Sequence, residues 1–132
     1  MNDDGLNGVG MAAALAKSYA DDAHGFLPAL AGFLEGTMPE AVEVERKAIS
    51  FFSSKKRVVG LKLTLGDYLY SLHEGHKDGI LEAHRSKIVR GVTLKTETVP
   101  VGTFLDNLSS ALTEHSKQSE TAYYALKEFL KQ

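Results

Sequence analysis

The fold is decided by a stretch near the middle of the chain, residues 59–73, which reads VGLKLTLGDYLYSLH. Apolar residues recur at every second position on both sides of Gly66-Asp67, the pattern of two strands that each bury one face. A two-residue turn at Gly66-Asp67 would join them as a hairpin, because glycine adopts the positive φ that such a turn requires. This register predicts three cross-strand pairs on one face: Leu65 with Tyr68, Leu63 with Tyr70, and Leu61 with Leu72.

A further strand is expected upstream of this hairpin. Val42 and Val44 alternate with glutamates, and the apolar pattern continues to Phe52. The alternation changes phase after Val44, which indicates either a β-bulge or a strand that is covered on both faces.

Downstream of the hairpin, a strand is expected from about Ile80 to Arg90, and an alternating pattern resumes after Gly91. We predict one long strand that is bent or bulged at Gly91, with a turn at Arg90-Gly91 as the alternative. Because every loop is short, the sequence predicts a mostly antiparallel sheet of four or five strands.

Helical periodicity marks the two ends of the chain. Apolar residues at three- and four-residue steps predict one or two helices over about 11–35, in which Pro28 either kinks the helix or marks a fresh start. A longer stripe of the same kind predicts a C-terminal amphipathic helix over 103–131, with Thr103 as its N-cap.

Together these elements predict an α+β fold. We expect a single domain over residues 11–132, in which a four- to five-stranded, mostly antiparallel sheet lies between an N-terminal helical segment and a long C-terminal amphipathic helix. Residues 1–10 are rich in glycine, asparagine and aspartate, and we expect them to form a mobile tail. The pattern leaves open which face of the sheet each helix covers.

The composition is that of a small globular protein. The chain has 132 residues, of which 43% are apolar and 24% charged, and it contains no cysteine. The lack of cysteine excludes disulfides, thiolate metal ligands and cysteine nucleophiles. Because no apolar run is long enough to cross a bilayer, we expect a cytoplasmic protein that has no contact with a membrane. We also expect no cofactor.

The charge is distributed unevenly along the chain. Residues 1–45 hold eight acids and one base, whereas residues 46–95 hold eleven bases and four acids. The basic segment is either an anion- or nucleic-acid-binding surface or a region that the acidic segment neutralises, and the second interpretation is favoured. The candidate anion-binding residues are Lys55, Lys56, Arg57, Lys62, Arg85 and Lys87.

Histidines gather just after the hairpin. His73 and His76 are three residues apart with Glu74 between them, and His84 follows nearby. Imidazole and carboxylate groups together can hold a divalent metal ion, so His73 and His76 are candidate metal ligands, and a metal-dependent enzyme at the 73–84 histidines is one functional hypothesis. A solvated polar turn is the favoured alternative. Since neither a nucleophile elbow nor a phosphate-binding glycine loop is present, we predict no catalytic residue and do not expect an enzyme.

The chain is rich in apolar residues, and two interpretations stay open. Either they exceed what one small sheet can cover, which is typical of proteins that bind other proteins, or helices on both faces of the sheet use them all. The favoured function is therefore a non-enzymatic protein-interaction or oligomerisation domain, expected to act as a homodimer or with another protein. The expected interface anchors lie toward the C-terminus: Leu108, Leu112, Tyr123, Leu126 and Phe129.

The stretch 87–100, KIVRGVTLKTETVP, resembles a pattern in small bacterial proteins that have no assigned activity. Residues 44–47, 66–70 and 104–108 extend this resemblance over roughly residues 40–130. The resemblance implies a sheet followed by an amphipathic helix with an aromatic residue near its start, which Phe104 supplies. It implies no catalytic or binding residue.

Overall fold

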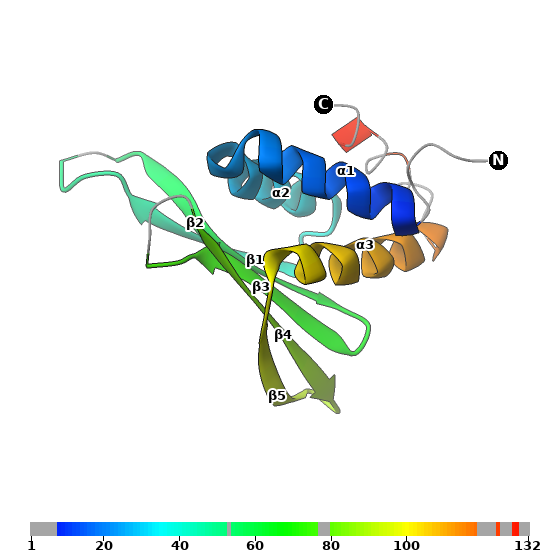
Figure 1. Cartoon of the computed structure of the whole chain (residues 1–132). Helices are drawn as coiled ribbons and strands as arrows, with labels where there is room; N and C mark the ends of the chain where they lie inside the picture. Colours follow the sequence, from blue (N-terminus) through cyan, green and yellow to red (C-terminus); the bar gives the residue numbers. More distant parts are fainter. Residues whose placement is uncertain (1–7, 53, 77–79, 119–123, 125–127, 130–132) are drawn as a thin grey trace.

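A computed structural model describes residues 8–52, 54–76, 80–118, 124 and 128–129 of the chain (Figure 1). Its helices are α1 (Gly8–Asp21), α2 (Ala23–Thr37) and α3 (Val101–Gln118). Its strands are β1 (Val42–Ala48), β2 (Lys56–Leu65), β3 (Tyr68–Glu74), β4 (Leu81–Val89) and β5 (Val92–Val99). Each strand pairs antiparallel with the next one along the chain, which confirms the predicted α+β class.

The central hairpin has the predicted register. Leu65 pairs with Tyr68, and the two further predicted pairs follow it in the β2–β3 ladder. Gly66 has a φ of 60°, as the tight turn requires. Leu63 and Tyr70 both lie in the hydrophobic core, so the two strands share one buried face.

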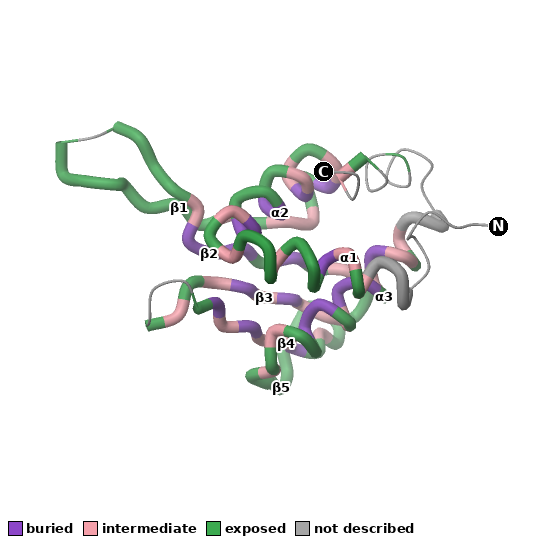
Figure 2. The backbone as a smooth tube through the Cα atoms, turned by 45° about the horizontal axis from the view of Figure 1, so that its top comes forward, coloured by how far each residue is buried: buried purple, intermediate pink, exposed green. Residues whose placement is uncertain are grey.

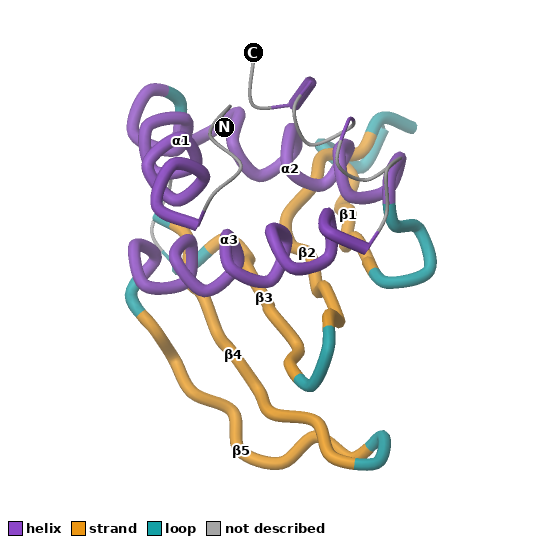
Figure 3. The backbone as a smooth tube through the Cα atoms, turned by 90° about the vertical axis from the view of Figure 1, so that its right-hand side faces the viewer, coloured by secondary structure: helices purple, strands orange, loops and turns teal. Residues whose placement is uncertain are grey.

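The helices lie together on one side of the sheet (Figures 1 and 3). Helix α2 packs on β1 and β2, α3 packs on β4, and α1 packs mainly against α3 and also contacts α2. The buried segments in Figure 2 concentrate between the helices and the sheet. Within the described part of the chain, no helix covers the opposite face of the sheet, which we call the outer face.

The two N-terminal helices separate at Asp22. Its side chain accepts a hydrogen bond from the backbone N–H of Gly25 at 2.9 Å, which caps the start of α2. The break therefore precedes Pro28, which lies inside α2. Helix α1 already includes Gly8 and the two residues after it, whereas the rest of the expected tail, residues 1–7, lies outside the described residues.

The strand expected to run through Gly91 is in fact two strands, so that prediction is wrong and its alternative is confirmed. Arg90 and Gly91 both have a positive φ, 53° and 79°, which is the geometry of a two-residue hairpin turn. The β1–β2 register shifts between Glu45 and Arg46, but the extra residue there is Val59 of β2, so the irregularity lies in the partner strand and not in β1 as predicted. Strand β1 ends at Ala48, so Phe52 lies beyond it.

Helix α3 begins at Val101, directly after Pro100 and two residues before the expected cap at Thr103. The backbone N–H of Phe104 donates to the carbonyl of Pro100 at 2.9 Å, so the first helical hydrogen bond already spans Thr103. Helix α3 is described as far as Gln118, and most of the remaining stretch predicted as helix, up to residue 131, lies outside the described residues. None of the described helices is long and apolar enough to cross a membrane.

Candidate functional site

The outer face of the sheet carries two neighbouring rows of polar residues. Side chains alternate along a strand, so the residues between the buried leucines of β2 and β3 point away from the helices. The first row, in pairing order, is Glu45, Gly60, His73 and Glu82. The second row is Glu43, Lys62, Ser71, His84 and Thr98.

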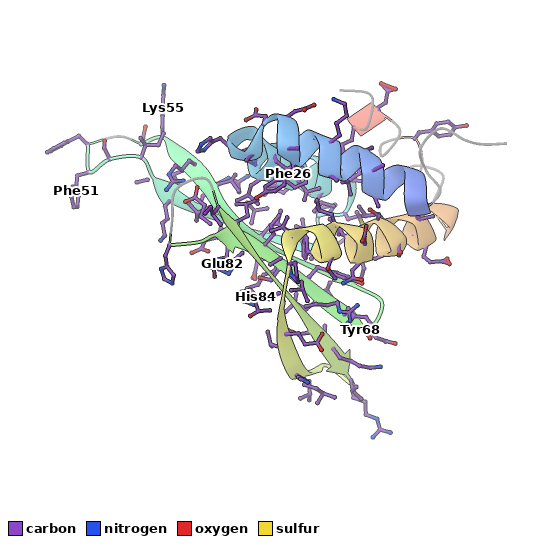
Figure 4. The ribbon with its side chains drawn as sticks, in the orientation of Figure 1. Phe26, Phe51, Lys55, Tyr68, Glu82 and His84 are labelled. Atoms are coloured by element: carbon purple, nitrogen blue, oxygen red, sulfur yellow. The ribbon has the colours of Figure 1, made fainter. Side chains whose placement is uncertain are left out.

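Two histidines meet where these rows adjoin. The Nε2 atoms of His73 and His84 lie 3.1 Å apart, and the rings are nearly parallel, at 10°, with centroids 5.1 Å apart. One ligand atom each of His73, His84 and Glu82 lies within 4.8 Å of the other two, and all three residues are half-buried. Figure 4 shows Glu82 and His84 together on the outer face, away from the helices. The sheet thus brings two imidazoles and one carboxylate to a single point.

The second nitrogen of each ring also has a partner. Nδ1 of His73 lies 3.0 Å from the carbonyl oxygen of Glu74 and, since a carbonyl only accepts, that nitrogen donates. Nε2 of a neutral His73 ring therefore presents its lone pair to His84. Nδ1 of His84 lies 3.2 Å from the hydroxyl of Thr98. Partners of this kind fix ring orientation and tautomer, as they do around metal-bound histidines.

Gly60 keeps the space beside His73 open. A Cβ atom at this position would lie 3.1 Å from the Cβ of His73 and 3.3 Å from Oε1 of Glu45. A hollow of about 410 Å³ opens over Gly60, and its lining includes Glu43, Lys62 and His73. Because Gly60 has no side chain to fill this hollow, the site is reachable from solvent.

A second hollow, of about 330 Å³, adjoins the first and shares Glu45 and His73 with it. Glu82 and His76 also line it, as do Arg57 and Glu74, which form an ion pair. A small molecule or water in this hollow would lie beside both His73 and Glu82. The cluster thus has protein groups on one side and open space on the other.

The structure gathers a set of candidate ligands that differs from the one predicted. His73 belongs to the cluster, but its neighbours there are His84 and Glu82, which come from β4. His76, on the segment after β3, lines the second hollow without joining the three converging groups. The sequence prediction missed Glu82, because its position opposite His73 depends on the β3–β4 register.

The candidate anion-binding residues lie in three separate places. Lys56 and Arg57 begin β2, directly after Lys55, and Lys62 is on the outer face of the same strand. Arg85 and Lys87 instead surround the ring of Tyr68, at 4.6 Å and 5.7 Å from its centroid. The six cations thus do not form one continuous surface.

The predicted interface anchors have different surroundings. Leu108 and Leu112 are buried in the core of this chain, because α3 turns them toward the sheet and α1, so neither offers surface to a partner here. Phe129 is half-buried and stacks on Phe33, with ring centroids 4.7 Å apart. Tyr123 and Leu126 lie outside the described residues. Homodimer formation remains a prediction.

Comparisons of the chain with protein-family models, with curated proteins and with solved structures find no match. The resemblance to small bacterial proteins therefore remains a prediction, and the functional argument rests on the geometry of the outer face.

Proposed function

We propose that the protein binds a divalent transition metal ion of the zinc type through Nε2 of His73, Nε2 of His84 and the carboxylate of Glu82. The observation that carries this proposal is the 3.1 Å separation of the two Nε2 atoms. Zinc binds imidazole nitrogens at about 2.0–2.1 Å, so two of them at a tetrahedral angle lie about 3.3–3.4 Å apart. The distance between the two Nε2 atoms thus has to change by only a few tenths of an ångström.

Metal binding requires a lone pair on both Nε2 atoms. In the hydrogen-bonded pair, one Nε2 carries the proton that lies between the rings. The Thr98 hydroxyl can accept as well as donate, so the proton of a neutral His84 can reside on Nδ1 and leave Nε2 available. The carbonyl of Glu74 holds His73 in the same tautomer.

A histidine pair with a purely structural role would require neither a nearby carboxylate nor open space beside it. Here Glu82 supplies the carboxylate, and Gly60 leaves the space. Two nitrogens and one oxygen suit zinc, nickel, cobalt or copper better than magnesium or calcium, which prefer oxygen ligands. With three protein groups at the site, a fourth position would face the hollow, so the bound ion could accept water or a small ligand.

Isothermal titration calorimetry with ZnCl₂ on untagged protein tests the proposal. Wild type is expected to bind one zinc ion per chain, and His73→Ala and His84→Ala are each expected to weaken binding at least about tenfold. His24→Ala, which removes an exposed histidine of α2 outside the cluster, should bind like wild type. Absence of binding by folded wild type, or equal binding by the His73→Ala/His84→Ala double variant, would refute the metal site.

A further inference from the structure

A second feature of the molecule lies away from the histidine cluster, at the end of the β1–β2 hairpin. This hairpin extends beyond the helices, and its end is the most outlying part of the described chain in Figure 1. Phe51 and Phe52, at its turn, are 103% and 101% exposed, and Ile49 is 58% exposed. We call residues 49–52 and 54–55 the hairpin tip. It presents two whole aromatic rings to solvent, and Figure 4 shows Phe51 pointing outward from it.

A backbone hydrogen bond closes the base of the tip. The backbone N–H of Ile49 donates to the carbonyl of Lys55 at 3.1 Å, which closes the loop between the two strands. Below it, Ala48 pairs with Lys56 and Lys47 pairs with Arg57, so the ladder continues up to the tip. The phenylalanines are therefore carried at a distance from the core rather than folded back onto it.

The tip and the strand ends next to it are strongly basic. Residues 46–57 contain five lysines and arginines and no acidic residue. Arg46 pairs with Glu35 of α2, and Arg57 pairs with Glu74 of β3. Lys47, Lys55 and Lys56 are all exposed around the strand ends, so the residues nearest the two rings contribute only positive charge.

We propose that the hairpin tip docks on a bilayer with anionic headgroups, inserting Phe51 and Phe52 while the neighbouring lysines contact the lipid phosphates. The two rings lie at the end of the hairpin and the cations lie three to five residues behind them on both strands, which is the order of acyl chains and phosphates in a membrane. A bilayer accepts a projecting tip without a preformed pocket, whereas a protein partner would have to supply one. Single-stranded nucleic acid is disfavoured, because it needs aromatic rings and cations along one groove.

This proposal replaces the expectation that the chain has no contact with a membrane. That expectation rested on the absence of a spanning segment, and docking at the surface does not require one. The proposal is independent of metal binding, since Phe51 and Phe52 do not line either hollow.

Co-sedimentation with vesicles tests the proposal, using phosphatidylcholine alone and phosphatidylcholine mixed with phosphatidylserine. Wild type is expected to sediment with the mixed vesicles only, and less so as salt is raised. Phe51→Ser/Phe52→Ser should lower partitioning by a factor on the order of ten or more, and Lys55→Glu/Lys56→Glu should lower it as well. The matched control is Val92→Ser/Leu94→Ser, which alters two exposed apolar residues of β5 and should bind like wild type.

Because the chain contains no tryptophan, Phe51→Trp adds a single fluorescent reporter at the tip. Its emission is expected to shift to the blue with the mixed vesicles and to stay unchanged with phosphatidylcholine alone. Absence of sedimentation, or equal sedimentation of Phe51→Ser/Phe52→Ser, would overturn the proposal. Binding without a blue shift would show surface attraction without insertion and would overturn it too, as would tip-dependent binding to single-stranded DNA alone.

Discussion

The backbone of Gly60 approaches its cross-strand partner His73 so closely that a Cβ at position 60 would lie 3.1 Å from the Cβ of His73. Glycine in the interior of a strand ordinarily weakens it, and one common reason for its presence is a close approach of other groups. At Gly60 the groups that approach closely are His73, a proposed metal ligand, and the carboxylate of Glu45.

Substitution of Gly60 tests whether the open space beside His73 is needed for metal binding. Gly60→Val is expected to displace His73 and to lower zinc affinity about tenfold or more, because the branched side chain fills the space between the two neighbours. Calorimetry measures the affinity, and circular dichroism checks the fold. Gly32→Ala is the control, since a Cβ there has no neighbour within 4 Å. Unchanged affinity in a folded Gly60→Val protein would contradict this role.

The hydroxyl of Thr98 is expected to tune the metal site through His84. Thr98→Val removes the group 3.2 Å from Nδ1 while keeping the shape of the side chain. Loss of a ligand's outer partner typically costs 10–100-fold in metal affinity, and we expect a loss of about that size for zinc. Thr93→Val, on the same strand but outside the polar rows, should bind zinc like wild type. Equal affinities of the two variants would exclude a positioning role for Thr98.

Alkaline pH should destabilise the fold through Tyr70. Burial raises the pKa of Tyr70 above its ordinary value, although nearby Arg85 partly opposes the shift. Since the folded state resists ionisation, the stability from the neutral phenol is full below about pH 10 and is lost as pH rises through the higher folded pKa. Chemical denaturation across this range should therefore show a smaller fall for Tyr70→Phe than for wild type. Identical pH profiles would contradict the shift.

Leu108 is expected to act on stability rather than on association. It is fully buried, so Leu108→Ala should lower the free energy of unfolding by about 2–5 kcal/mol. Leu94→Ala, at a residue that is 55% exposed, should have a much smaller effect. Denaturation at several protein concentrations, together with light scattering, measures both properties. A change of oligomeric state in Leu108→Ala without loss of stability would restore this leucine as an interface anchor.

The sequence predicts those parts of the fold that depend on local chemistry. The β2–β3 hairpin follows from strict alternation around Gly66-Asp67, because glycine meets the φ requirement and the pattern fixes the register. The turn at Arg90-Gly91 is harder to predict, because it needs an arginine with a φ of 53°, a conformation that propensity does not suggest. The alternation on either side of it is also what one bent strand would show.

The histidine cluster could be predicted only in part for a related reason. Spacing along the chain draws attention to His76, three residues from His73, although the chain turns away between them. Glu82 and His84 are nine and eleven residues from His73 and reach it only through the β3–β4 ladder. The length of the connecting turn sets that register, and the alternating pattern does not specify the length.

The strand order also has a consequence for how the molecule folds. Since β1 to β5 pair strictly with their neighbours in the chain, the sheet can grow by closing short loops, each with a small entropic cost. The packing of α1 on α3 instead joins two helices that lie before and after the whole sheet in the sequence, so it closes a much longer loop. A nascent chain could thus complete its sheet during synthesis, while α1 would find its main partner only after α3 had left the ribosome.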